Sequence, residues 1–248
     1  MVLIIEIGDT GLDNNKNKRY CVQPHPEKSV RIIGTTRRSV SGYFMWNGSS
    51  IPYESSLERD FLIRTTFSSN VLDIISQPMR IDFTAISGRE YSYTPDYLVY
   101  YRTDENAEWG TGRSPLLVEV KPREEIRSKW PSMKSKFKAA LRYAKQQGYK
   151  FAIFDESRIR DQKLENIVFL QRYKRMEFSE EQTKWILENL QNMGQASFEY
   201  LLTRHFFGET DRAVGISHLW HMLVHGLIEC DMLQPLTNQT TLWVPSNE

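Results

Sequence analysis

Residues 116–122, Leu-Leu-Val-Glu-Val-Lys-Pro, together with residues 94–99, Thr-Pro-Asp-Tyr-Leu-Val, decide the fold that this chain is expected to adopt. Glu119 and Lys121 are two positions apart in an apolar run, so strand alternation puts both side chains on one face and the flanking valines on the other. The ~20 residues between Asp96 and Lys121 suit two strands joined by a polar, glycine-containing loop. We therefore expect Asp96 to lie beside Glu119 on neighbouring strands.

Two carboxylates and a lysine in this arrangement are typical of a metal-dependent nuclease. Mg²⁺ prefers oxygen ligands and keeps several waters, and it polarises a scissile phosphate and lowers the pKa of a bound water. Lys121 would add positive charge where negative charge develops in the transition state. The alternative is a solvated hairpin face with a cross-strand ion pair. The apolar surroundings of Glu119 disfavour this alternative, because burying an unpaired carboxylate costs free energy.

A third carboxylate, Glu58, lies in a predicted helix that begins near Ser55 and carries Leu57, Phe61 and Leu62 at helical spacing. Two interpretations of Glu58 remain open. Ser55-x-x-Glu58 matches a capping box, in which the glutamate turns back to the start of its own helix. Alternatively, Glu58 points from the helix toward the metal site.

The order of these three motifs resembles the catalytic core of the TnsA family of transposition endonucleases, which have a restriction-endonuclease-like fold. The similar segments are residues 56–61, 93–97 and 117–123, within a resemblance that spans about residues 40–175. The resemblance implies Mg²⁺-dependent cleavage of double-stranded DNA at the 5′ ends of a transposon, with Mn²⁺ as a substitute metal. It also implies a separate DDE transposase that cuts the 3′ ends, and an AAA+ regulator that contacts this protein.

The resemblance also implies roles for single residues. Glu58 and Asp96 match metal ligands of the family, and Lys121 matches its catalytic lysine. Glu119 is implied as a ligand or as the group that positions the attacking water, since some members of the family have Gln at this place.

Net charge and charge distribution predict local rather than global contact with DNA. The chain has 248 residues, 40% of them hydrophobic, and a net charge of +1, so it can fill a core but is not a polycation. Basic residues concentrate between positions 121 and 150 and again before position 42. The open alternative is a solvated helix face. The residues predicted to contact DNA are Arg37, Arg38, Arg123, Arg127, Lys129, Lys134, Lys136 and Lys138.

The composition also predicts the cellular compartment of the protein. Cys21 and Cys230 form neither a CxxC motif nor a secreted disulfide framework, which predicts a reducing compartment. The sequence has no apolar run of ~18 residues and no charged-then-apolar leader, so we expect no membrane contact and no export. The expected location is the cytoplasm of a prokaryote, in association with DNA.

Three regions are predicted along the chain. Residues 1–42 form an N-terminal extension, and we assign no function to its first ~28 residues. The aromatics of residues 43–46 are expected to dock from a loop onto the core. Residues 43–176 form the α/β restriction-endonuclease-like catalytic domain, a mixed sheet flanked by helices. It includes a helix over 133–147 and strands at 151–154 and 167–169.

Residues 177–248 are predicted to form a C-terminal winged-helix domain. The pattern indicates three helices, followed by a hairpin of residues 229–232 with 240–244. The expected third helix carries His221, His225 and apolar residues rather than the Arg, Asn and Gln that read bases. Contact with the AAA+ regulator is therefore favoured over DNA contact, and a domain that only covers the core is the plainer alternative.

The sequence thus predicts the endonuclease subunit of a heteromeric cut-and-paste transposase. Two other functions are kept open. A stand-alone restriction or repair nuclease with the same core would cut DNA without partners. A non-catalytic scaffold subunit would bind DNA and leave it intact.

Overall fold

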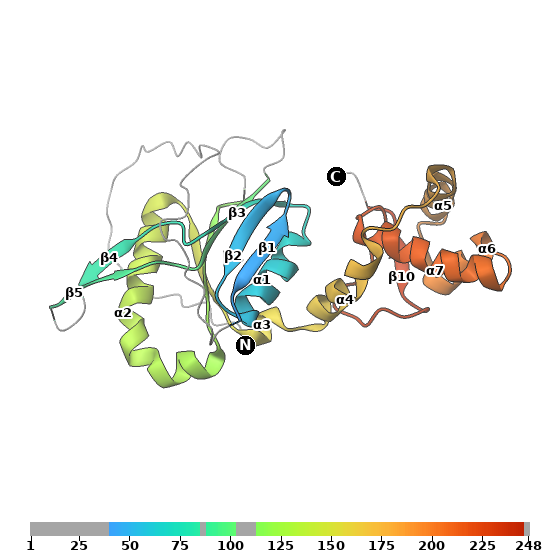
Figure 1. Ribbon diagram of the computed structural model, residues 1–248. Coiled ribbons are helices and arrows are strands. Elements are labelled where there is room, and N and C mark those ends of the chain that lie inside the picture. The colour runs from blue at the N-terminus through green and yellow to red at the C-terminus, as the bar shows by residue number, and fades with distance from the viewer. Residues whose placement is uncertain (1–39, 85–87, 103–112, 246–248) are drawn as a thin grey trace.

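The computed structural model describes residues 40–84, 88–102 and 113–245. Figure 1 shows two lobes, a sheet-containing lobe built from the N-terminal part of the chain and a helical C-terminal lobe, with α3 and α4 between them. Arg37, Arg38 and Cys21 lie outside the described residues, as does most of the predicted N-terminal extension. No helix in the described part of the chain is long and apolar enough to cross a bilayer.

The central sheet has four strands in the order β3-β6-β7-β8. Its strands β6 (Tyr97–Tyr101) and β7 (Leu116–Val120) pair antiparallel, with Tyr97 opposite Val118, and β3 (Val71–Ser76) pairs antiparallel with the other edge of β6. β8 (Lys150–Phe154) runs parallel to β7 because the long helix α2 (Arg123–Gln147) carries the chain back between them. The prediction of a mixed sheet flanked by helices is confirmed.

Helices cover both faces of this sheet. Helix α1 (Ser56–Thr66) packs on one face, where Phe61 stacks on Tyr97 with ring centroids 5.5 Å apart. Helix α2 packs on the other face, where its buried alanines contact Leu98 and Leu117. Glu119 points to the α2 side, on the same strand face as Leu117, as side-chain alternation requires.

Two hairpins flank the sheet. In the first, β1 (Gly42–Trp46) pairs with β2 (Ser49–Tyr53), and in the second, β4 (Ile81–Thr84) pairs with β5 (Glu90–Tyr93). Phe44 and Trp46 pack on the core, as expected of the aromatics in residues 43–46, whereas Tyr43 is exposed. The segment is a strand rather than the expected loop, and this alternation explains why only half of its side chains dock.

Helix α2 begins ten residues earlier than the predicted 133–147, at Arg123. The added part of the helix includes Pro131, which lies inside the helix. A proline there removes one intrahelical hydrogen bond and bends the helix without having to end it. Figure 1 shows the resulting corner between the first turns of α2 and the longer part that lies along the sheet.

The strand predicted at residues 167–169 is wrong, because this segment lies in helix α4 (Gln162–Leu170). Asp161 caps the helix by accepting a hydrogen bond from Leu164 N–H at 3.1 Å. Leu164, Ile167 and Leu170 are buried at a spacing of three, which is a helical period. A short apolar run does not distinguish a strand from a buried helical segment, and here tertiary packing selected the helix.

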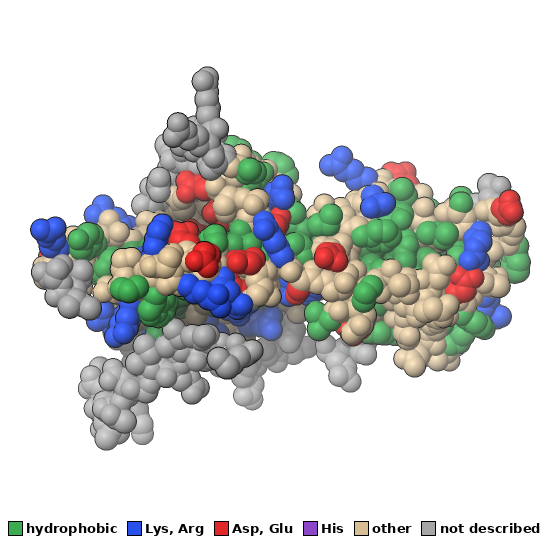
Figure 2. Space-filling view, turned by 90° about the horizontal axis from the view of Figure 1, so that it is seen from below, with side chains coloured by type: hydrophobic (Ala, Val, Ile, Leu, Met, Phe, Trp, Pro, Cys, Tyr) green, Lys and Arg blue, Asp and Glu red, His purple; other side chains and the backbone are tan. Residues whose placement is uncertain are grey.

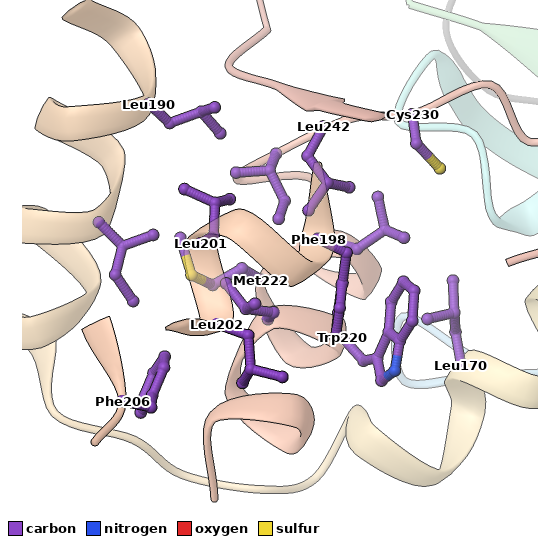
Figure 3. Packing of buried hydrophobic residues seen from close by; sticks show 14 residues of the cluster. Leu170, Leu190, Phe198, Leu201, Leu202, Phe206, Trp220, Met222, Cys230 and Leu242 are labelled. Carbon is purple, nitrogen blue, oxygen red and sulfur yellow. The ribbon is translucent and has the colours of Figure 1, made fainter. Parts of the chain in front are cut away.

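The C-terminal lobe contains α5 (Glu180–Met193), β9 (Gln195–Ser197), α6 (Phe198–His205), α7 (Glu209–Val224) and β10 (Thr241–Trp243). Its core contains Phe198, which stacks on Trp220 at 4.1 Å, together with leucines of α5, α6 and β10 (Figure 3). The predicted hairpin of 229–232 with 240–244 is reduced to one bridge between Glu229 and Trp243. The main partner of β10 is β9, a long-range antiparallel pairing.

Helix α4 and the short helices beside it link the two lobes. It follows α3 (Glu156–Ile159) and continues into the 3-10 turn η1 (Gln171–Tyr173). Leu164 belongs to the core of the first lobe, whereas Leu170 belongs to the core of the second. Since α4 contributes to both cores, the predicted boundary at residue 176 stays a prediction.

Candidate active site

Asp96 immediately precedes β6, where three hydrogen bonds fix it. Its N–H donates to the carbonyl of Val118 at 3.0 Å, and its carbonyl accepts from Gln77 N–H at 2.8 Å. Its side-chain Oδ2 accepts from Val120 N–H at 2.7 Å. Gln77 has φ +48°, a left-handed conformation that is uncommon for a residue other than glycine. The carboxylate is therefore held rigidly against the end of β7.

Glu119 is almost completely buried, with 1% of its surface exposed. Oε1 accepts a hydrogen bond from Lys136 Nζ at 3.0 Å, and Oε2 accepts one from the Tyr93 hydroxyl at 2.5 Å. Burial raises the pKa of Tyr93, as does the charge of Glu119, so its hydroxyl keeps the proton that it donates. The two partners compensate the burial of the Glu119 charge.

Lys121 follows the last residue of β7, and its ammonium lies between the two carboxylates. Lys121 Nζ is 3.5 Å from Asp96 Oδ2 and 3.6 Å from Glu119 Oε1. Burial by itself would lower the pKa of Lys121, but the neighbouring carboxylates, chiefly Asp96 and Glu119, together outweigh it and raise the pKa above the ordinary 10.5. Lys121 therefore carries a fixed positive charge at neutral pH and is not a proton acceptor.

The carboxyl of Asp96 has excess negative charge around it. Burial, together with the charges of Glu119 and Glu58, raises its pKa from 3.8 to about 8, although Lys121 and the hydrogen bond from the Val120 N–H lower it. These surroundings favour the protonated form of Asp96 when no metal cation is bound. A bound cation can take the place of this proton.

Glu58 forms a capping arrangement in this structure. Its N–H donates to Ser55 Oγ at 3.1 Å, and its Oε1 accepts from the Ser55 hydroxyl at 2.9 Å. Oε2 accepts from Glu54 N–H at 2.8 Å and from the Tyr97 hydroxyl at 3.3 Å. The structure therefore brings Asp96, Glu119 and Lys121 into contact, while Glu58 is joined to them only through its electrostatic effect on Asp96 and Lys121.

The donor set at this position fits a magnesium ion. Within the described residues, no three His, Cys, Asp or Glu side chains converge closely enough to form a metal site by themselves. Mg²⁺, however, is commonly held by one or two carboxylates together with waters and substrate phosphates. Asp96 Oδ1 accepts no hydrogen bond from any described residue, and the raised pKa of this largely buried carboxyl reflects its burial and the neighbouring charge of Glu119.

The basic residues predicted to contact DNA separate into groups. Arg123 and Lys129 form ion pairs with Asp155 and Glu125, at 2.9 and 3.2 Å. Lys136 binds Glu119 in the site itself. The three that are exposed, and that form no ion pair with a described residue, are Arg127, Lys134 and Lys138. On the face shown in Figure 2, basic and acidic side chains are interspersed over the sheet-containing lobe, so this surface is not uniformly basic.

Sequence reasoning missed Gln77 and Tyr93, and it gave Lys136 a different role. A signal for Lys136 was present: it lies three residues after Met133 and four before Ala140, on the apolar stripe of α2. A lysine on such a stripe needs a buried partner. For Gln77 and Tyr93, the sequence contains no comparable signal, because their contacts with Asp96 and Glu119 depend on how the hairpin and sheet are assembled.

The mixed sheet, with helices on both faces and a carboxylate pair beside a lysine, is consistent with an α/β nuclease core. A family model described as TnsA-like endonuclease N terminal matches residues 68–156, and one described as TnsA endonuclease C terminal matches residues 158–232. The chain belongs to the TnsA family, the endonuclease subunits of Tn7-type transposases, which act on DNA with a transposase partner. No curated protein matches the sequence.

The extent of the match bears on the site. Asp96, Glu119 and Lys121 lie inside the N-terminal match, whereas Glu58 and the whole of α1 precede it. The family assignment therefore rests on the strands of the core and on the C-terminal lobe, independently of the Glu58 motif.

Proposed function

We propose that this chain is the Mg²⁺-dependent endonuclease that cuts the 5′ strands at the ends of a transposon, and that Mn²⁺ can replace Mg²⁺. The observation that carries the proposal is the convergence of Asp96 and Glu119 from neighbouring strands on Lys121 Nζ, at 3.5 and 3.6 Å. Family membership favours this role over a stand-alone restriction or repair nuclease.

The roles of the residues follow from their contacts. Asp96 and Glu119 would supply carboxylate oxygens to the metal, and Glu58 would be a third ligand once released from Ser55 and Glu54. When bound, Mg²⁺ supplies Lewis-acid polarisation of the phosphate and an acidified water. Lys121, held protonated, places positive charge beside the phosphate where negative charge develops. Glu119 is held by two donors, which suits a group that orients a water.

The proposed partners are double-stranded DNA at the transposon ends, a DDE transposase and an AAA+ regulator. We propose that the C-terminal lobe is a winged-helix domain, supported by its order of helix, strand, two helices and a closing strand. The only arginine or lysine of α7 is Arg212, which is paired with Glu199 at 2.7 Å. Contact with the regulator therefore fits this lobe better than base reading does.

The first test is a strand-specific cleavage assay. The full chain is incubated with end-containing DNA, Mg²⁺ and the transposase and regulator encoded with it, and each strand is labelled separately. Metal-dependent cuts at the 5′ strands support the proposal. Cleavage without partners would favour the stand-alone nuclease, and binding without cleavage would favour a scaffold.

We expect Glu58→Gln and Ser55→Ala to differ in activity but not in stability. Both disturb the capping arrangement, so each should cost about 1 kcal/mol of unfolding free energy. Glu58→Gln also removes a charged ligand and should lower cleavage by more than roughly tenfold, whereas Ser55→Ala should not. Thermal unfolding and single-turnover cleavage measure the two effects. Equal activity of the two variants would leave Glu58 with the capping role alone.

We expect Lys134→Gln combined with Lys138→Gln to weaken DNA binding equally for all sequences. Each lost phosphate contact should reduce the slope of log K against log salt by about 0.9. Binding titrations at several salt concentrations measure the slope. Lys184→Gln removes a charge from the other lobe, where the side chain is 78% exposed, and is the matched control. An unchanged slope would identify these lysines as a solvated helix face.

We expect Phe207→Ser to weaken assembly with the regulator while the fold persists. Phe207 is 71% exposed between α6 and α7, so its replacement removes no core contact. Pull-down with the regulator, together with thermal unfolding, tests this expectation. Tyr43→Ser, at a side chain that is 61% exposed in the other lobe, is the control. If the two variants assemble equally well, the C-terminal lobe only covers the core.

A further inference from the structure

Lys136 differs from the other basic residues of α2 in its surroundings. Lys134 and Lys138 are exposed, whereas only 21% of the Lys136 side chain is exposed. Its position on the apolar stripe of the helix, between Met133 and Ala140, turns it toward the sheet. A phosphate-contacting lysine on a helix surface has no need of this burial.

The contacts of Lys136 converge on Glu119. Lys136 Nζ lies 3.0 Å from Glu119 Oε1, and it also lies 5.0 Å from the ring centroid of Tyr93 and 4.8 Å from that of Phe137. The Tyr93 hydroxyl holds the other oxygen of Glu119 at 2.5 Å. Lys136 and Tyr93 therefore form a clamp on the Glu119 carboxylate, one from α2 and one from β5.

The clamp has a consequence for Lys121. Both lysines approach the same oxygen, Glu119 Oε1, but Lys136 lies at 3.0 Å and Lys121 at 3.6 Å. Because Lys136 takes the shorter contact, Lys121 remains between Glu119 and Asp96 rather than closing onto Glu119. Without Lys136, the uncompensated charge of Glu119 would draw Lys121 toward it.

We infer that Lys136 is a positioning residue of the endonuclease site, which holds Glu119 against Tyr93 and thereby keeps Lys121 directed at the scissile phosphate. The inference rests on the proposed function and extends it to a helix-borne lysine. It replaces the role predicted for Lys136 from the sequence, contact with the DNA backbone. The two roles differ in what they affect: positioning changes the rate at saturating DNA, and phosphate contact changes the affinity.

The test compares Lys136→Met with Lys138→Met in the complete assembly with end-containing DNA and Mg²⁺. Methionine keeps the length of the side chain and its packing on the two rings. We expect Lys136→Met to lower the single-turnover rate at saturating DNA by roughly 10–100-fold, with Kd for DNA within about twofold of wild type. Lys136→Arg restores the charge and should recover part of the rate. Lys138→Met should act mainly by raising Kd.

Three results would overturn the inference. In the first, Lys136→Met would raise Kd as Lys138→Met does and keep the wild-type rate at saturating DNA. In the second, Lys136→Met would change neither Kd nor that rate, and in the third, Lys136→Arg would recover none of the lost rate. If Lys136→Met does not fold, Tyr93→Phe removes only the hydroxyl of the clamp and should still lower the saturated rate with Kd unchanged, and an unchanged rate overturns the inference. If the wild-type assembly binds DNA and never cuts it, the proposed function fails and the inference fails with it.

Discussion

Asp96→Asn is expected to abolish cleavage and, at the same time, to stabilise the metal-free protein at about pH 8. Cleavage should fall by a factor of roughly 10³ or more, because the variant removes a charged oxygen ligand from the centre of the site. Asn keeps an oxygen that can accept the hydrogen bond from Val120 N–H, so the loss of activity does not come from a lost structural contact.

The stability gain follows from the pKa of Asp96. Burial, with the charges of Glu119 and Glu58, raises it from 3.8 to about 8. Between these values the folded chain binds a proton that the unfolded chain has released, so the stability of the wild-type protein falls as pH rises and levels off above about 8. Asn does not ionise, so the variant lacks this decline.

The expected gain for Asp96→Asn is on the order of 2 kcal/mol, or roughly 4–8 °C in Tm. Thermal unfolding without divalent cations, from about pH 5 to pH 9, measures it. Adding Mg²⁺ should raise the Tm of the wild type, more at high pH than at low pH, and should have little effect on the variant. Asp82→Asn changes a side chain that is 75% exposed and is the control. Cleavage by Asp96→Asn at the wild-type rate would refute the assignment of Asp96.

The part of this site that the sequence predicts well is the part set by local periodicity. Alternation along residues 116–120, together with the spacing from Asp96, is enough to pair β6 with β7 and to bring Asp96, Glu119 and Lys121 together. These features depend on strand geometry and on loop length, both of which are visible in one sequence.

Features that depend on tertiary packing were not predictable in the same way. Residues 167–169 have the composition of a strand, but the burial of Leu164, Ile167 and Leu170 at a helical spacing selects a helix. Glu58 matches a capping pattern and a ligand pattern equally well, and the structure shows the capping contacts. The position of Lys136 on the apolar stripe of α2 indicates a buried partner, but only the fold shows that this partner is Glu119.

Lys121→Met is expected to abolish cleavage while Mg²⁺ binding persists, which separates its role from that of Asp96. The variant removes the positive charge that faces the phosphate, and the loss of one such group costs roughly 10²–10³-fold in rate. The two carboxylates remain, and Lys121 no longer competes for them at 3.5 and 3.6 Å. A divalent cation should therefore bind at least as tightly as in the wild type.

The measurement for Lys121→Met combines single-turnover cleavage with the Mg²⁺-dependent rise in Tm. We expect the variant to retain or enlarge the Mg²⁺ shift, since a metal ion offsets the repulsion between Asp96 and Glu119 that Lys121 otherwise reduces. Lys184→Met, at a side chain that is 78% exposed, controls for the loss of one charge.

A Lys121→Met variant that loses the Mg²⁺ shift along with cleavage would assign Lys121 a structural role in holding the carboxylates. A variant that cuts normally would remove it from the reaction. We expect both variants to lose cleavage, but only Asp96→Asn to lose the Mg²⁺-dependent rise in Tm. That combination requires Asp96 to hold the ion and Lys121 to act on the phosphate.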